Sequence, residues 1–152
     1  MNRLLAARGY VYACVLKKPS AFRYEGMNHL AAVSELAMLL AARRGENTEL
    51  AGIAGIFHDF SVYAEDAVSD HAHKSAAAAA AWMKENGSFS REETEQVIGA
   101  VYYHSDKKMK HLPLDEILKD ADVAAYVLEH PGELTERERS RWNALKDELM
   151  LP

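Results

Sequence analysis

Histidine and aspartate residues lie at well-separated points of the sequence where apolar helical segments would bury them. His29 continues the apolar side of one segment, and the adjacent pair His58-Asp59 ends the apolar run AGIFHDF. Asp122 lies within the apolar stretch DADVAAYVL. Burial of an aspartate is costly unless it is paired or bound to a metal ion, and a buried histidine needs partners for two ring nitrogens. Neutral imidazole and carboxylate are suitable ligands for several divalent metals, so these residues predict a metal site.

The adjacent pair His58-Asp59 restricts where such a site can form. Neighbouring residues of a helix point about 100° apart, so the two side chains cannot share one helix face. Near a helix end, however, both can converge on a point beyond the terminus. Because an isolated His-Asp pair also occurs often by chance, the interpretation depends on the other ligands.

The elements that must position these residues are predicted to be helices throughout. Alanine and leucine are abundant, only four prolines and eight glycines interrupt them, and runs of β-branched residues are absent. Helix propensity and the three-to-four-residue apolar spacing therefore predict an all-α fold. The expected helices cover residues 3–17, 27–44, 48–60, 71–86, about 90–104, 113–128 and 135–149, with a loop at 61–70 and no second domain within residues 1–152.

Capping residues support several of these boundaries. Asn47 is a suitable N-cap, and Gly45 and Gly87 are suitable helix stops. Ser90 and Glu93 have the spacing of a capping box.

Composition limits the classes of partner. The 152 residues suffice for one domain with a sizeable core, and 49% hydrophobic with 27% charged residues is typical of a soluble globular protein. A net charge of −5 argues against nucleic-acid and acidic-membrane partners, because either needs a basic face. The single cysteine, Cys14, and the lack of a signal-peptide pattern predict a cytoplasmic location, and no apolar run approaches the length of a membrane span.

The order of these four residues along the chain resembles the ligand pattern of the HD-domain phosphohydrolase superfamily. The pattern of that family is a histidine on an early helix, an HD pair at the end of the next helix and a later aspartate in a helix, and here the resemblance spans about residues 23–128. It implies a compact orthogonal bundle of about six to seven helices. It also implies one or two divalent transition-metal ions (iron, manganese, zinc, nickel or cobalt). The implied ligands are His29, His58, Asp59 and Asp122, the last chosen over Asp120 because the second acid of the Asp-Ala-Asp stretch is the usual ligand.

Two more histidines extend the resemblance. Some branches of the superfamily bind two metals, and the segments HAHKSA and VIGAVYYH are similar to the contexts in which those branches carry extra histidines. We expect His71 and His104 either to hold a second metal ion or to contact the substrate phosphate directly. His73, His111 and His130 are expected at the surface.

The resemblance implies hydrolysis of a nucleotide or another phosphate ester or anhydride by a metal-activated water. Asp59 would combine the roles of ligand and general base, and His71 and His104 would complete the catalytic set. Arg23, Lys74, Lys107, Lys108 and Lys110 are cations that could meet the substrate phosphate. For any single lysine of the basic loop, a solvated charge run is the ordinary alternative.

Two other interpretations remain at this point. A non-catalytic HD module that binds a metal or nucleotide for regulation would show the same ligand set. A plain helical bundle would contain the histidines as structural residues and hold no stoichiometric metal. The substrate is open among nucleotides, dinucleotides and other phosphate esters, and the short chain with apolar ends would permit a homodimer.

Overall fold

The computed structural model describes residues 2–152, and within that range it consists of eight α-helices and no strands. The helices are α1 (Arg3–Val15), α2 (Ser20–Arg44), α3 (Thr48–Phe57), α4 (Phe60–Glu65), α5 (His71–Asn86), α6 (Arg91–Tyr103), α7 (Pro113–Glu129) and α8 (Glu136–Leu149). The prediction of an all-α fold is therefore confirmed.

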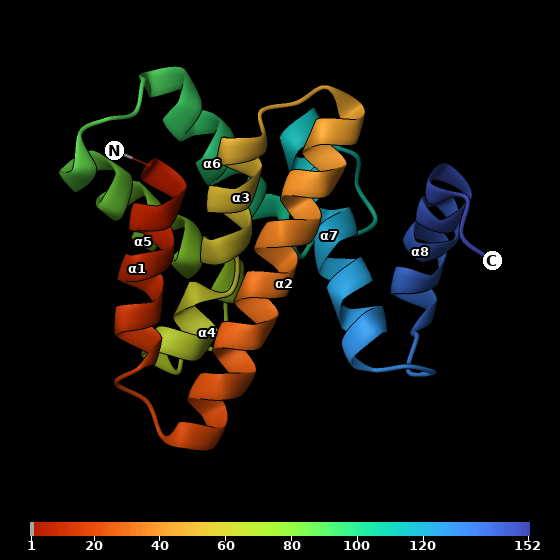
Figure 1. The fold of residues 1–152 in the computed structure, drawn as a ribbon, viewed down its shortest axis with the longest axis horizontal. Helices are drawn as coiled ribbons and strands as arrows, with labels where there is room; N and C mark the ends of the chain where they lie inside the picture. Colours follow the sequence, from red (N-terminus) through yellow and green to blue (C-terminus); the bar gives the residue numbers. More distant parts are fainter. Residues whose placement is uncertain (1) are drawn as a thin grey trace.

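Helix α3 forms the centre of the core. Every residue from Leu50 to Phe57 is buried, and α1, α2, α5, α6 and α7 all contact it (Figure 1). Removal of this apolar surface from water is the main favourable contribution to the fold. At Gly55 the backbone of α3 touches that of α2, because a Cβ atom there would lie only 2.5 Å from the Cα atom of Ser34. Glycine at this position thus brings the helix that carries His29 directly against the helix that ends at His58.

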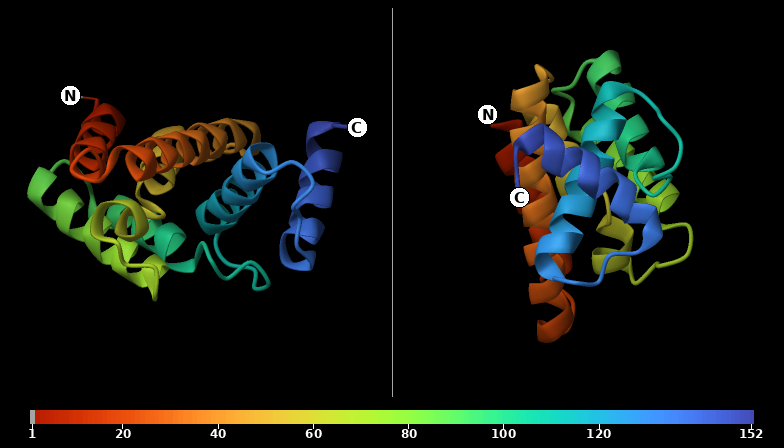
Figure 2. Two further views of the ribbon diagram at one scale, coloured as in Figure 1. Left: turned by 90° about the horizontal axis from the view of Figure 1, so that it is seen from below. Right: turned by 90° about the vertical axis from the view of Figure 1, so that its right-hand side faces the viewer.

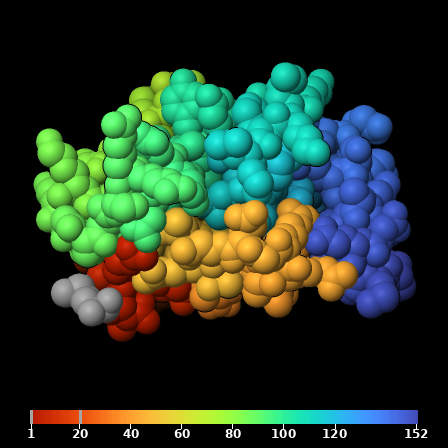
Figure 3. All heavy atoms as spheres, turned by 90° about the horizontal axis from the view of Figure 1, so that it is seen from above, coloured from red at the N-terminus to blue at the C-terminus, as the bar shows by residue number. Residues whose placement is uncertain are grey.

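The longest helix, α2, runs along one side of the molecule and packs against both α3 and α7 (Figure 2). Helix α8 packs against α7 and forms one end of the molecule, with the chain termini at opposite ends (Figures 1 and 3). None of the helices within residues 2–152 is long and apolar enough to cross a membrane.

The predicted caps agree with the structure. The side chain of Asn47 accepts a hydrogen bond from the Leu50 amide at 3.1 Å, and Ser90 and Glu93 form the reciprocal bonds of a capping box. Gly45 and Gly87 end their helices in the left-handed conformation, with φ of 74° and 69°.

Two predicted boundaries are wrong, and tertiary contacts explain both. Residues 61–65 belong to the short helix α4 where a loop was expected, because Phe60 and Ser61 are buried and the Ser61 amide donates to Ser75 Oγ at 3.0 Å. Helix α2 begins at Ser20 rather than near residue 27. Gly26 lies inside this helix although glycine has a low helix propensity. A Cβ atom there would come within 2.6 Å of the Tyr63 ring, so close packing against Tyr63 favours glycine at this position.

Candidate metal centre

Four side chains from distant parts of the chain meet at one point between the helices. His29 lies within α2, His58 is the C-cap of α3, Asp59 follows it directly, and Asp122 lies within α7. The Nε2 atoms of His29 and His58 are 3.2 Å apart, and Asp122 Oδ1 is 3.6 Å from each. Asp59 Oδ2 is 3.4 Å from His58 Nε2 and 3.9 Å from His29 Nε2. Because the pair His58-Asp59 follows a helix end, its two side chains can face the same point.

A second group of side chains adjoins the first through Asp59. The other carboxylate oxygen, Oδ1, lies 3.2 Å from His104 Nε2 and 3.5 Å from His71 Nε2. His104 is the buried C-cap of α6, whereas 31% of the His71 side chain, at the start of α5, is exposed. These residues form three triplets of potential ligand atoms, and Asp59 belongs to two of them.

All four histidines present the same nitrogen to this centre. In His58, His71 and His104, Nδ1 donates to the backbone carbonyl three residues earlier, and in His29 it donates to Glu129 Oε2 at 2.8 Å. The three carbonyl acceptors belong to Gly55, Val68 and Val101, at 2.8, 3.2 and 2.7 Å. A partner on one ring nitrogen fixes the tautomer and leaves the other free to bind a metal. The four free Nε2 atoms all face the carboxylates.

The inward-facing atoms are suited to a cation. Neutral Nε2 atoms and carboxylate oxygens are all acceptors, and the buried Asp59 Oδ1 atom has no hydrogen-bond donor among the described residues. Buried polar atoms of this kind normally have a partner. Atoms that each coordinate an ion at about 2.1 Å lie roughly 3–3.5 Å from one another, close to the separations here. The donor set therefore fits a divalent metal ion.

Electrostatics keep the carboxylates ionised and favour the protonated forms of His29 and His58 when no cation is bound. Burial opposes the charged form of His58, but Asp59 and Asp122 outweigh it and raise its pKa to about 10. Burial likewise disfavours the Asp59 carboxylate, yet His58 and His104 hold its pKa well below the usual range. Burial lowers the pKa of His104 itself. A metal ion at this centre must therefore displace a proton from His58.

One of the predicted phosphate-binding cations meets the cluster. Lys107 is buried, and its Nζ atom lies 2.5 Å from Asp122 Oδ2 and 2.6 Å from the His104 carbonyl oxygen. Lys74 instead donates to the Ser69 carbonyl, and Arg23 donates to the Leu16 carbonyl. Lys108 is exposed, as is Lys110. Within residues 2–152, no hydrogen bond or ion pair joins these other four cations to the cluster.

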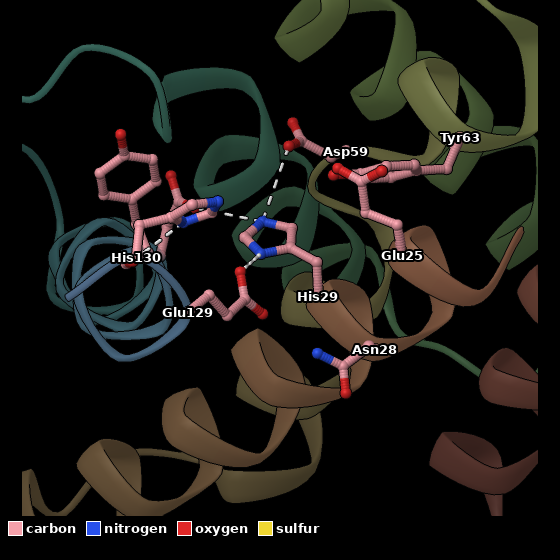
Figure 4. A pocket seen from close by; sticks show the side chains of 9 residues that line it. Glu25, Asn28, His29, Asp59, Tyr63, Glu129 and His130 are labelled. Carbon is pink, nitrogen blue, oxygen red and sulfur yellow. Dashed lines mark hydrogen bonds and ion pairs between the residues drawn. The ribbon is translucent and has the colours of Figure 1, made fainter. Parts of the chain in front are cut away.

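A cavity of about 350 Å³ opens beside the cluster (Figure 4). Its walls are Glu25, Asn28, His29, Asp59, Tyr63, Asp122, Tyr126, Glu129 and His130. Glu25 and Glu129 were not among the predicted site residues, although a signal for them exists. Glu25 precedes His29 by four residues and Glu129 follows Asp122 by seven, so each shares a helix face with a predicted ligand.

Of the three histidines predicted at the surface, His73 and His130 are exposed and only His111 needs correction. His111 is half-buried, and its Nδ1 atom lies 2.6 Å from the Nζ atom of the fully buried Lys119. His130 is exposed, but it lines the cavity and stacks on Tyr126. His73 is also exposed and stacks on Tyr102.

Comparison with known protein families agrees with this geometry. The family model described as "HD domain" matches residues 26–126, about two thirds of the chain. The chain belongs to the HD domain family. Membership of this family indicates a metal-dependent hydrolase, and the matched HD domain contains all six histidines and aspartates of the three triplets, whereas Glu25 and Glu129 lie outside it. No curated protein and no solved structure matches the chain.

Proposed function

We propose that this HD-domain protein is a phosphohydrolase that uses a divalent transition metal to hydrolyse small phosphate esters or anhydrides, nucleotides among them. The observation that carries the proposal is the set of inward-facing atoms around Asp59. Two imidazole Nε2 atoms and two carboxylate oxygens lie within 3.9 Å of their neighbours. Hydrogen bonds on the Nδ1 atoms fix the tautomers of the two imidazoles. When His29 and His58 are neutral, as metal binding requires, all four groups are acceptors that face one another, and a cation is the partner that they lack.

The ligands in this proposal are His29, His58, Asp59 and Asp122, with iron, manganese, zinc, nickel or cobalt as candidate ions. When bound, such an ion lowers the pKa of water and withdraws charge from a phosphoryl oxygen. The ionised carboxylates of Asp59 and Asp122 provide the negative charge that retains the ion. Their low pKa values keep them ionised across the neutral range.

Asp59 and the two remaining histidines are proposed to act next to the attacking water. Asp59 Oδ1 lacks a hydrogen-bond donor, so it can orient a water molecule and receive its hydrogen bond. His71 shares this oxygen and is partly open to solvent, which provides a route by which a proton can leave. His104 is neutral and buried beside the same oxygen, which suits either a second ion or a direct contact with phosphate.

Lys107 is the proposed source of fixed positive charge. It lies on the side of Asp122 that faces away from the two imidazoles and cannot move freely, since it also bonds the His104 carbonyl. An ammonium group held there can attract phosphoryl oxygens as a point charge.

The test is a screen of metal-free protein against phosphate esters and anhydrides with each of the five metals added. We expect hydrolysis that requires metal and that Asp59→Ala abolishes, whereas Asp106→Ala, which alters an exposed acid on the neighbouring loop, retains it. Stoichiometric metal without hydrolysis of any ester or anhydride would instead indicate a non-catalytic HD module. Absence of metal binding would indicate a plain helical bundle.

A further inference from the structure

The cavity beside the cluster has an unusual charge for a site that accepts phosphate. Four of its lining residues are carboxylates, and none of the described residues that line it is lysine or arginine. Asp59 and Asp122 are needed to hold an ion, whereas Glu129 bonds the far side of the His29 ring and Glu25 belongs to the cavity wall (Figure 4). The part of a substrate that extends from the reacting phosphate into this cavity therefore faces negative charge.

A smaller cavity on the other side of Asp122 contains cations as well as carboxylates. It has a volume of about 180 Å³ and includes Lys107 and Arg137 among its walls, together with Glu138. The two cavities share Asp122 and Tyr126. A phosphoryl group placed at the cluster would therefore have two cations on one side, each paired with a carboxylate, and two further carboxylates on the other side. Its oxygens would face Lys107, and its leaving group would extend into the larger cavity.

Aromatic rings complete the larger cavity. Tyr63 packs between Phe22 and His29, in the space that Gly26 leaves free, and Tyr126 stacks on His130. Tyrosine faces attract cations, and carboxylates accept hydrogen bonds from them. One oxygen of Glu129 bonds His29, and its other oxygen has no donor among the described residues.

We infer that the substrate is a phosphate monoester whose alcohol portion carries a protonated amine. This inference depends on the proposed phosphohydrolase activity. In the reaction, the oxygen of water bonds to phosphorus as the ester P–O bond breaks, and one proton of that water ends on the alcohol oxygen. The amine lies between Glu25, Glu129 and the two tyrosines, whereas a second phosphate or a carboxylate at the same position meets like charge.

The test measures binding with a matched series of non-hydrolysable ligands. Titration calorimetry on the manganese-loaded protein would compare 3-aminopropylphosphonate, 3-hydroxypropylphosphonate and 3-phosphonopropionate, which differ only in the terminal group. We expect affinity to fall in that order, by about tenfold or more from amine to carboxylate, since like-charge contacts strongly disfavour a wrong partner. Equal affinities, or the reverse order, would overturn the inference.

A charge-neutral variant makes the test specific. Glu25→Gln should reduce the ratio of amine to carboxylate affinity by about threefold to tenfold, since it removes one carboxylate from the cavity wall. Glu35→Gln, which alters an exposed acid of the same helix outside the cavity, should leave the ratio unchanged. A ratio that survives Glu25→Gln in full would count against the assignment.

Measurements of binding and of turnover distinguish a failure of the substrate class from a failure of the hydrolase function. Hydrolysis of phosphate esters without any order in the phosphonate series would leave the hydrolase function standing and overturn the substrate class. The expected order without hydrolysis of O-phosphoethanolamine or any other ester would support selection of a cationic group and overturn the hydrolase function.

Discussion

Two groups of charged residues lie on either side of α7, and they differ in how completely their charges are paired. On one side, an ion-pair network joins α7 to α2 and α8. In it Glu116 lies 2.9 Å from Lys119 and 2.8 Å from Arg141. Further pairs extend it: Asp120 with Arg141 at 3.0 Å, Asp120 with Arg44 at 2.8 Å, and Arg44 with Glu148 at 2.7 Å. Each carboxylate of this network thus faces a guanidinium or ammonium group.

The cluster of His29, His58, Asp59 and Asp122 on the other side is incomplete by comparison. Its single permanent cation is Lys107, its remaining partners are imidazoles, and Asp59 Oδ1 lacks a donor within the described chain. Asp120 and Asp122 illustrate the contrast, because they lie two residues apart on one helix and face these different surroundings. Saturation with fixed cations is typical of a structural role, whereas a shortage of them is typical of a site for an ion.

The largest expected effect is a difference in activity between variants of these two aspartates. Asp122→Asn should lower metal-dependent hydrolysis by more than about 100-fold, since even the outer partners of metal ligands typically contribute about 10–100-fold. Asp120→Asn should keep activity within about twofold but lower the free energy of unfolding by about 1–3 kcal/mol, because it leaves parts of Arg44 and Arg141 unpaired. Steady-state kinetics and urea unfolding of both variants test this. Comparable losses of activity in the two variants would contradict the contrast.

Metal addition should stabilise the cluster and not the network. At a free metal concentration of about 100 times the dissociation constant, the folded state gains about 2.7 kcal/mol, which raises Tm by about 5–10 °C. The same shift is expected in Asp120→Asn, whereas Asp59→Asn should lose most of it. Differential scanning fluorimetry after chelator treatment measures the shifts. An undiminished shift in Asp59→Asn would place the ion elsewhere.

A smaller effect is expected from Glu129, which holds the Nδ1 atom of His29 at 2.8 Å. Glu129→Met removes this acceptor and should weaken metal binding by about 10–100-fold. Glu129→Gln retains an acceptor and should weaken it less. Competition with a chromogenic chelator gives the affinities, and circular dichroism controls for folding. If the two variants bind metal equally, the hydrogen bond to His29 does not set the affinity.

The smallest expected effect is an opposite response of the two regions to pH in the metal-free protein. The pKa of His58 is raised to about 10, so its contribution to stability is full below the unfolded value near 6.5 and disappears as pH rises through 10. Burial alone would raise the pKa of Glu116, but its bonds to Lys119 and Arg141 lower it to about 2. Its contribution is therefore present above the unfolded value near 4.5 and disappears as pH falls through 2.

Thermal unfolding of chelator-treated protein across this pH range tests both effects, the loss of stability at acid pH (the acid limb) and the loss at alkaline pH (the alkaline limb). Glu116→Gln should reduce the pH dependence of the acid limb and leave the alkaline limb unchanged. Saturating metal should remove the alkaline limb, because a bound His58 is neutral in both conditions. An alkaline limb that persists unchanged with metal would indicate that His58 is not a ligand.

Local sequence signals predicted much of this arrangement. Helix periodicity and caps such as Asn47 and Ser90 depend on neighbouring residues, so most helix boundaries followed from the sequence. The convergence of His29, His58 and Asp122 depended on their order along the chain and their apolar contexts, which a resemblance to a family made interpretable.

Features that depend on tertiary contacts were not predictable. Helix α4 exists because Phe60 and Ser61 are buried against other helices, and six residues are too few to show a helical period. The burial of Lys107 differs from the exposure of Lys108 only because of what each side chain faces after folding. Glu129 could have been identified from its seven-residue spacing to Asp122, but acids at that spacing on an exposed helix face are common.

The backbone contact between Gly55 and Ser34 has a mechanical consequence. Because main chain meets main chain there, the distance between α2 and α3 at this point depends on the absence of a side chain at residue 55. Any side chain larger than hydrogen at residue 55 would push the two helices apart and widen the gap between the imidazoles of His29 and His58, whose Nε2 atoms are now 3.2 Å apart.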